Sequence, residues 1–270
     1  PETVLGAGVQ PRTVTRYVAL GSSMAAGPGI TPRVSGSPRR AGRSARNYPA
    51  LVADALGLDL TDVTYSGATT DHILSDSQNG TPPQLAALSG APVELVTITI
   101  GGNDVGYVPM LMAAGLPGPL RRLGPIRDLL DPGARDQALA TIGARLRAVG
   151  RAVRDRAPQA TVCFVDYLTL LPPPGVSARP LSDRHADLGR HIADRLAAET
   201  AAAAEETGCV LVPAAALSRE HHAWSAVPWT VGPGLPWPRR PAPRQRPRRL
   251  PRQPGNGGPA SSTSPRCASA

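Results

Sequence analysis

The chain has 270 residues, enough for one α/β domain with a large core or at most two small domains. Hydrophobic residues make up 41% and aromatic residues 3%, so a core has to be built mainly from alanine, valine, leucine and isoleucine. The formal charge is +9, but eight arginines follow Glu220, the last acidic residue, and subtracting them leaves +1 for residues 1–220. The nearly neutral body argues against a nucleic-acid-binding domain.

No uninterrupted run of about 18 apolar residues occurs, so the sequence predicts no membrane span. The three cysteines, Cys163, Cys209 and Cys267, fit no metal-site spacing. We interpret Cys163 and Cys209 as small residues of buried strands, while the sequence does not decide the disulfide state. Because the chain begins at Pro1 rather than Met, its cellular compartment is left open, and secretion with removal of a leader is one alternative.

Strand-like and helix-like segments alternate along the chain. Five apolar segments are typical of parallel strands covered on both faces: 17–20, 61–65, 93–100, 161–167 and 209–213. Apolar residues at gaps of three and four predict a helix over 135–155. Ser182 is the predicted N-cap of a second helix, which Gly208 closes, and a shorter helix is expected over 47–56. This alternation predicts an open, three-layer α/β/α sandwich.

The composition changes after about residue 227. Residues 228–270 contain eleven of the 31 prolines, eight arginines and no acidic residue. Such a segment buries too little apolar surface to offset its chain entropy. We therefore predict a folded domain over 1–227 and a disordered Pro/Arg-rich tail over 228–270.

Three polar segments follow the first three predicted strands. They are Gly21-Ser22-Ser23, Ser66-Gly67 and Gly101-Gly102-Asn103-Asp104. In open parallel sheets, ligands bind at the carboxyl ends of the strands. The three segments are thus expected at one functional edge of the sheet.

These residue types suit acyl transfer, which needs a nucleophile, donors for the developing oxyanion, and a base. Ser23 is the candidate nucleophile. The candidate donors are the backbone N–H groups of Ser23 and Gly67 and the side-chain amide of Asn103. The alternatives are that Ser23 is an ordinary turn serine and that Asn103 and Asp104 only cap a helix.

At these positions the chain resembles the SGNH (GDSL-type) hydrolase family, over roughly residues 15–225. Gly21-Ser22-Ser23-Met24 matches the first block, Gly67 the second, and Gly101–Asp104 the third. The resemblance implies a flavodoxin-like sandwich with a parallel five-stranded sheet. It also implies an ester hydrolase that needs no metal or other cofactor, with Ser23 as nucleophile and Gly67 and Asn103 completing the oxyanion hole.

The chain departs from the family pattern in two places. Ser22 stands where the first block usually has aspartate. The family's final Asp-x-x-His block, which supplies the base, has no counterpart, because no histidine follows His222 and no acidic residue follows Glu220. Our hypothesis is that the reading frame shifts near residue 230. His221 and His222 are the substitute bases left to consider.

The remaining titratable candidates have simpler interpretations. His72, His185 and His191 fall on predicted helices and are interpreted as surface residues. Asp166, at the end of the fourth strand, is interpreted as a capping or loop residue, the alternative being that it orients a histidine.

Two functions from different classes follow. One is an esterase or lipase-like hydrolase that forms an acyl-serine on Ser23 with a small-molecule ester. The other is a catalytically impaired protein of the same fold that binds an acyl or ester ligand. A third interpretation makes the arginine tail an anchor for nucleic acid or anionic lipid. Acyl-chain length, leaving group and oligomeric state are not predicted.

Overall fold

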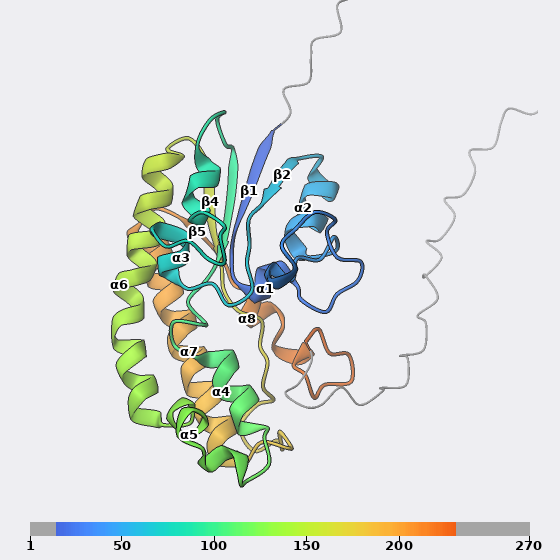
Figure 1. Ribbon diagram of the computed structural model, residues 1–270, viewed down its shortest axis with the longest axis vertical. Helices are drawn as coiled ribbons and strands as arrows, with labels where there is room; N and C mark the ends of the chain where they lie inside the picture. The colour runs from blue at the N-terminus through green and yellow to red at the C-terminus, as the bar shows by residue number, and fades with distance from the viewer. Residues whose placement is uncertain (1–14, 231–270) are drawn as a thin grey trace, which may run out of the picture. The chain divides into compact units, whose positions relative to one another are not determined.

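The structure is a computed structural model that describes residues 15–230. Five strands form one fully parallel sheet in the order β2-β1-β3-β4-β5 (Figure 1). They are β1 Arg16–Gly21, β2 Asp59–Asp62, β3 Leu95–Thr99, β4 Thr161–Val165 and β5 Val210–Val212. This is the flavodoxin-like order of doubly wound sheets. The predicted fold class is confirmed.

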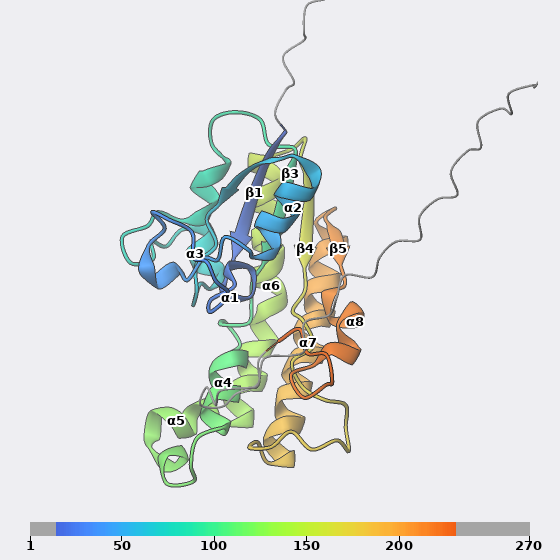
Figure 2. The same cartoon turned by 90° about the vertical axis from the view of Figure 1, so that its right-hand side faces the viewer.

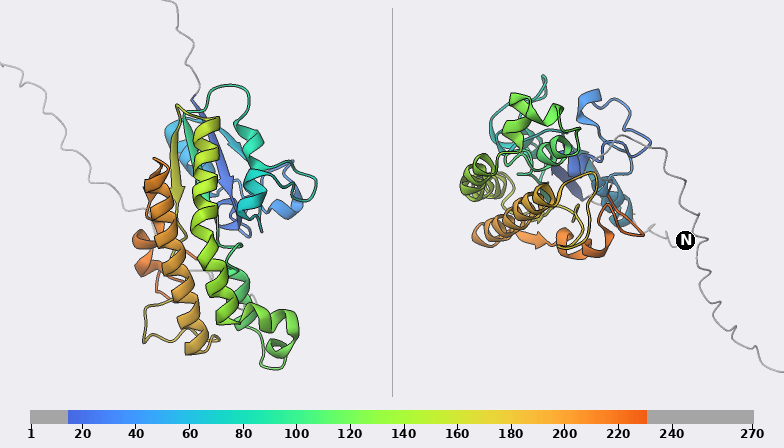
Figure 3. Two further views of the ribbon diagram at one scale, coloured as in Figure 1. Left: turned by 90° about the vertical axis from the view of Figure 1, so that its left-hand side faces the viewer. Right: turned by 90° about the horizontal axis from the view of Figure 1, so that it is seen from below.

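Helices lie on both faces of the sheet. The α-helices are α1 Ser23–Ala26, α2 Tyr48–Leu56, α3 Thr70–Leu74, α4 Tyr107–Ala114, α5 Gly124–Leu129, α6 Pro132–Arg156, α7 Asp183–Glu206 and α8 Ala214–Leu217. The short 3-10 helices are η1 Arg39–Ala41, η2 Gln84–Leu88, η3 Leu120–Arg122 and η4 Arg219–His221. The two longest helices, α6 and α7, lie side by side over one face (Figure 3).

The main core lies between the sheet and the α6–α7 layer. It is made mainly of aliphatic side chains, as the composition predicts, with Ile98, Ile142, Leu146 and Ile192 fully buried. A smaller cluster on the opposite face joins Tyr17 and neighbouring side chains to α2. Figure 2 shows α2 over one half of that face, whereas Val210 on β5 is 52% exposed. Within the described residues, helices thus cover this face of the sheet less fully than α6 and α7 cover the other.

Most predicted elements occur close to their expected positions. The helices predicted over 47–56 and 135–155 are α2 and α6, and Ser182 caps α7 as expected, its side chain accepting from His185 N. β2 ends at Asp62 rather than at residue 65, although Val63 N and Tyr65 N still donate to Ala19 O and Gly21 O of the β1 strand. The helix predicted around His72 is α3, whereas α1, α4, α5 and α8 were not predicted, since each is too short to carry a clear apolar period.

Several expectations meet the structure only in part. The segment 231–270, most of the predicted tail, lies outside the described residues, as does Cys267. Cys163 and Cys209 are free thiols. No helix within 15–230 combines the length and apolar character needed to cross a membrane. Across the same residues, no group of three or more histidine, cysteine, aspartate or glutamate side chains could hold a metal ion.

Candidate active site

The candidate nucleophile follows a turn that only glycine can make. Gly21, the last residue of β1, has φ +148°, and a Cβ there would lie 2.5 Å from the backbone oxygen of Thr99. Ser22 N then donates to the same oxygen at 2.9 Å. This bond turns the chain out of the sheet, so that Ser23 becomes the first residue of α1 at the carboxyl edge of the strands.

The two serines of the turn have different environments. Ser22 is fully buried, and its hydroxyl shares a hydrogen bond of 2.9 Å with the hydroxyl of Tyr167. Ser23 is partly exposed, and among residues 15–230 its hydroxyl has no hydrogen-bond partner. Ser23 is therefore the serine that can meet a substrate, while Ser22 belongs to the core.

A buried glutamine holds the turn from the other side. The side chain of Gln84 accepts from Gly21 N at 2.7 Å and donates to Gly21 O at 3.0 Å. Tyr65 N also donates to Gly21 O, at 2.9 Å. The peptide groups that precede Ser23 are thus fixed by contacts with η2 and with the segment after β2.

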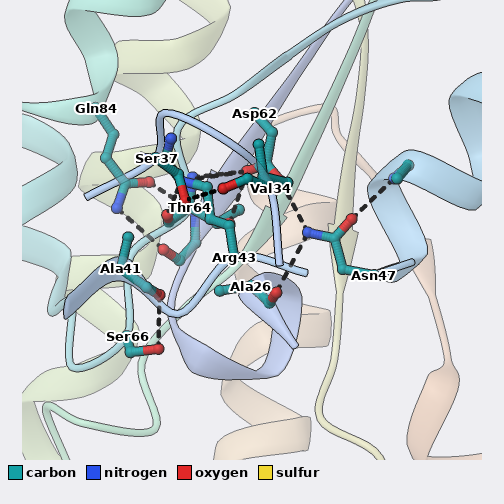
Figure 4. A network of polar contacts seen from close by, with 12 residues as sticks. Ala26, Val34, Ser37, Ala41, Arg43, Asn47, Asp62, Thr64, Ser66 and Gln84 are labelled. Atoms are coloured by element: carbon teal, nitrogen blue, oxygen red, sulfur yellow. Dashed lines mark hydrogen bonds and ion pairs between the residues drawn. The ribbon is translucent and has the colours of Figure 1, made fainter. Parts of the chain in front are cut away.

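A polar network fixes the far end of α1 (Figure 4). Asn47 Nδ2 donates to Asp62 Oδ2 at 2.8 Å and to Ala26 O at 3.4 Å. Asp62 Oδ1 accepts from the Thr64 hydroxyl at 2.7 Å, and Arg43 Nε donates to Thr64 O at 2.6 Å. Burial lowers the pKa of the Arg43 guanidinium, while the nearby Asp62 carboxylate opposes that shift. The network ties the helix that carries Ser23 to the end of β2.

The two other candidate donors lie on segments that contact each other. Gly67 has φ +81°, and the nearest atom to a Cβ there would be Gln78 Nε2 at 3.7 Å, so the backbone is open to close approach. Asn103 Nδ2 donates to Ala68 O at 2.8 Å. This bond engages one of the two amide hydrogens and leaves the other available.

Asp104 anchors the same pair of segments. Its carboxylate accepts from both the N–H and the hydroxyl of Thr70 at the start of α3. Arg145 Nη1 lies 3.8 Å from it. Burial raises the pKa of Asp104, while the Thr70 bonds and Arg145 act in the opposite direction. The N-cap of α4 is Gly106, with no side-chain bond, so Asn103 and Asp104 do not cap the helix that follows them.

Neither substitute base is hydrogen-bonded to Ser23 in the described part of the chain. His221 Nδ1 donates to Val227 O at 2.8 Å, and its ring stacks on Trp229 at 4.1 Å. His222 Nδ1 accepts from Trp224 N at 3.2 Å. In the neutral rings these bonds leave an unprotonated Nε2 on His221 and a protonated one on His222. His221 is therefore the one of the two whose Nε2 can accept a proton.

The other histidines and Asp166 take structural roles. His72 closes a capping box at the start of α3, His185 contacts the Ser182 cap, and His191 pairs with Asp136 on the surface. Asp166 accepts from Ala215 N at 2.7 Å. It therefore caps α8, as its interpretation as a capping residue predicted.

Two residues of this region were missed from the sequence. Tyr167 was seen only as the end of a strand, and Gln84 lay in a segment with no predicted element. Neither belongs to a motif, and both reach the nucleophile turn across more than 60 residues of chain. Only the fold could reveal them.

Comparison with known proteins decides the family. The model of the GDSL-like lipase/acylhydrolase family matches residues 19–233. The chain belongs to this family. Family membership confirms the predicted class, a hydrolase acting on ester bonds.

Related proteins of known name agree with this assignment. Lipase 2 of Streptomyces coelicolor is 34% identical over 242 residues, which is 87% of this chain and 79% of that protein. A lipase of Streptomyces rimosus is 31% identical over 82% of this chain and 78% of that protein. The crystal structure of the extracellular lipase from Streptomyces rimosus superposes with a TM-score of 0.69 at 29% identity, covering 83% of this chain and 90% of that one. A phospholipase A1 from Streptomyces albidoflavus gives 0.62 at 26% identity, with 80% and 86% covered.

Proposed function

We propose that this chain hydrolyses small carboxylic esters through an acyl-serine on Ser23. The relatives named lipase and phospholipase A1 support an ester substrate. The observation that carries the proposal is the contrast within the turn: Ser22 is buried and bonded, whereas the Ser23 hydroxyl has no partner in residues 15–230 and is accessible. A nucleophile must be reachable and must present its oxygen to the substrate.

The oxyanion would be held by three donors. These are the N–H groups of Ser23 and Gly67 and the Asn103 amide. The bond from Asn103 Nδ2 to Ala68 O supports this set, because it brings the amide to the carbonyl of the residue after Gly67. Such donors are neutral and preorganised, and each contributes roughly 3 kcal/mol to lowering the barrier.

The second candidate function is binding of an acyl or ester ligand without efficient hydrolysis. It is favoured by one observation: no imidazole in residues 15–230 is hydrogen-bonded to Ser23. Without a general base the hydroxyl stays protonated and attacks slowly. The oxyanion donors could still orient a bound carbonyl.

Two measurements separate the candidates. If the chain is a hydrolase, a fluorophosphonate probe labels Ser23 and the protein turns over a short-chain p-nitrophenyl ester. The Ser23→Ala variant is then neither labelled nor active. If the wild type is neither labelled nor active, the hydrolase proposal fails and ligand binding is left. A variant in which residues 231–270 are replaced by a segment carrying Asp-x-x-His then measures the contribution of the base. A slow wild type and a faster replacement variant would mean that the oxyanion site works and the base limits the rate.

A further inference from the structure

The hydroxyl of Tyr167 lies between the nucleophile turn and the Gly101–Asp104 segment, which carry two of the candidate residues for the proposed reaction. Its oxygen lies 2.9 Å from Ser22 Oγ and 3.0 Å from Gly102 N. Ser22 precedes the candidate nucleophile, and Gly102 precedes the candidate oxyanion amide. We propose that Tyr167 is a positioning residue that sets the Ser23 hydroxyl relative to the Asn103 amide; this inference rests on the proposed function of those two residues.

The bridge starts where the sheet stops. β1 and β3 pair in register up to Gly21 and Thr99, and one further bond joins Ser22 N to Thr99 O. Beyond that bond the chain turns into α1 on one side and into the Gly101–Asp104 segment on the other. The Tyr167 hydroxyl, two residues beyond the end of β4, then bridges the continuations of β1 and β3.

The hydrogen-bond chemistry of the bridge is complete. Gly102 N–H can only donate, so the Tyr167 oxygen accepts there. Between Tyr167 and Ser22 either hydroxyl can donate. The Tyr167 hydroxyl donates to Ser22 Oγ, or the Tyr167 oxygen accepts a second hydrogen bond from the Ser22 hydroxyl. Burial raises the pKa of Tyr167 to about 12, so the hydroxyl keeps its proton at neutral pH. Titration of Tyr167 therefore does not alter the bridge at neutral pH.

The tyrosine ring packs against a neighbouring ring and against the backbone of the third block. It is buried and lies edge-on to Tyr107, with ring centroids 6.5 Å apart at 74°. A Cβ on Gly102 would lie 2.6 Å from the ring Cζ, so glycine is needed at this position for the tyrosine to reach the backbone. The ring fills the space that a side chain at position 102 would need.

A tyrosine hydroxyl can be the buried hydrogen-bond partner of position 22 because that position is a serine. The family usually has aspartate at this position, and a buried carboxylate would need charged or multiple donors. A serine hydroxyl needs only one neutral partner, which Tyr167 supplies. The bridge therefore suits the serine variant of the first block that this chain carries.

The test compares two tyrosine-to-phenylalanine variants of the full chain. Tyr167→Phe removes the bridge. Tyr17→Phe is the matched control, because the Tyr17 hydroxyl makes one buried bond of 2.7 Å to Thr97 Oγ1, near the opposite end of β1 from the turn. Both variants lose one buried hydroxyl, so both lose some stability. kcat and KM for p-nitrophenyl butyrate are measured, together with the Kd of phenylboronic acid, which forms a tetrahedral adduct on a serine.

We expect Tyr167→Phe to lower kcat by about tenfold or more with KM within about twofold, because a small displacement of reacting groups is costly in rate. The Kd of phenylboronic acid should rise by a comparable factor. Tyr17→Phe should match the wild type in all three values. Wild-type values for Tyr167→Phe would overturn the inference, as would equal losses in the two phenylalanine variants.

Two further variants keep the outcomes distinct. If Tyr167→Phe does not fold, Ser22→Ala removes the same bond from the other side and should lower kcat with KM unchanged. Ser23→Ala tests the proposed function itself: if it leaves hydrolysis and boronate binding intact, both proposals fail. If the wild type shows no hydrolysis but binds phenylboronic acid through Ser23, only the hydrolase proposal fails, and the boronate Kd alone decides the role of Tyr167. A wild type that does neither overturns both.

Discussion

The residues that shape the nucleophile turn are small because the backbone passes through a crowded strand end. At Gly21 the crowding comes from the backbone of Thr99, which cannot move aside as a flexible side chain can. At Gly102 it comes from the ring of Tyr167. Both glycines precede a candidate site residue by one or two positions, so the site depends on close packing directly behind it.

Gly21→Ala should destabilise the protein more than Gly29→Ala. Both glycines have positive φ, but a Cβ at Gly29 meets nothing within 4 Å. The difference in the free energy of unfolding therefore reports the clash with Thr99 O, and we expect about 1–3 kcal/mol. Urea denaturation of the two variants measures it. Equal losses would mean that the strand end adjusts freely.

At the scale of elements, short helices border the candidate site, and side chains fix them in place. α1 follows the Gly21 turn, Asp104 secures the start of α3, and Asp166 secures α8. None of these helices is long enough to be stable by itself. Their positions depend on buried carboxylates and amides from neighbouring loops.

The stability of the wild type relative to an Asp166→Asn variant should fall as pH rises. Burial raises the pKa of Asp166 above its ordinary value, although the Ala215 and Ala214 N–H groups oppose the shift. The unfolded chain therefore releases this proton at lower pH than the folded protein does. Between the ordinary aspartate pKa of about 3.9 and the raised folded value, the folded state holds more protons, so the unfolding free energy falls as pH increases.

Urea titrations of both proteins between pH 3 and pH 7 measure this difference. The Asp155→Asn variant removes an exposed carboxylate and is the control. If the unfolding free energy of Asp166→Asn varies with pH as that of the wild type does, the expected fall is contradicted. Asp166 would then have the same pKa in the folded and unfolded states.

At the scale of the whole molecule, the charge and the folded domain separate along the chain. The family match ends at residue 233, and all eight arginines that follow Glu220 lie beyond it. Removing them lowers the formal charge from +9 to +1. The domain boundary near residue 227 is still a prediction, as is the shift of reading frame near residue 230.

A chain ending at Gly234 should unfold at the same temperature as the full chain, within about 2 °C, because residues 235–270 offer few large apolar side chains to bury. Calorimetry of both chains measures this. The shorter chain should also elute from a cation exchanger at much lower salt. A clear fall in Tm would show that the segment contributes to the core, and would contradict the predicted boundary.

The family and the class of fold could be predicted from the sequence because they depend on local signals. Apolar runs of strand length, the helical period over 135–155 and the three polar blocks all lie within a few neighbouring residues. The candidate nucleophile Ser23 and the candidate oxyanion donors Gly67 and Asn103 are predicted from the same blocks. What the sequence could not distinguish was the environment of each residue within a block.

The tertiary structure decided those environments. It buried Ser22 and left Ser23 accessible, although the two are identical and adjacent in sequence. It also brought Tyr167 and Gln84 to the turn, from positions 145 and 63 residues away along the chain. The physical reason is that parallel strands place their carboxyl ends at one edge, so residues distant in sequence meet there. Such contacts leave no periodic or compositional signal, and only the folded chain contains them.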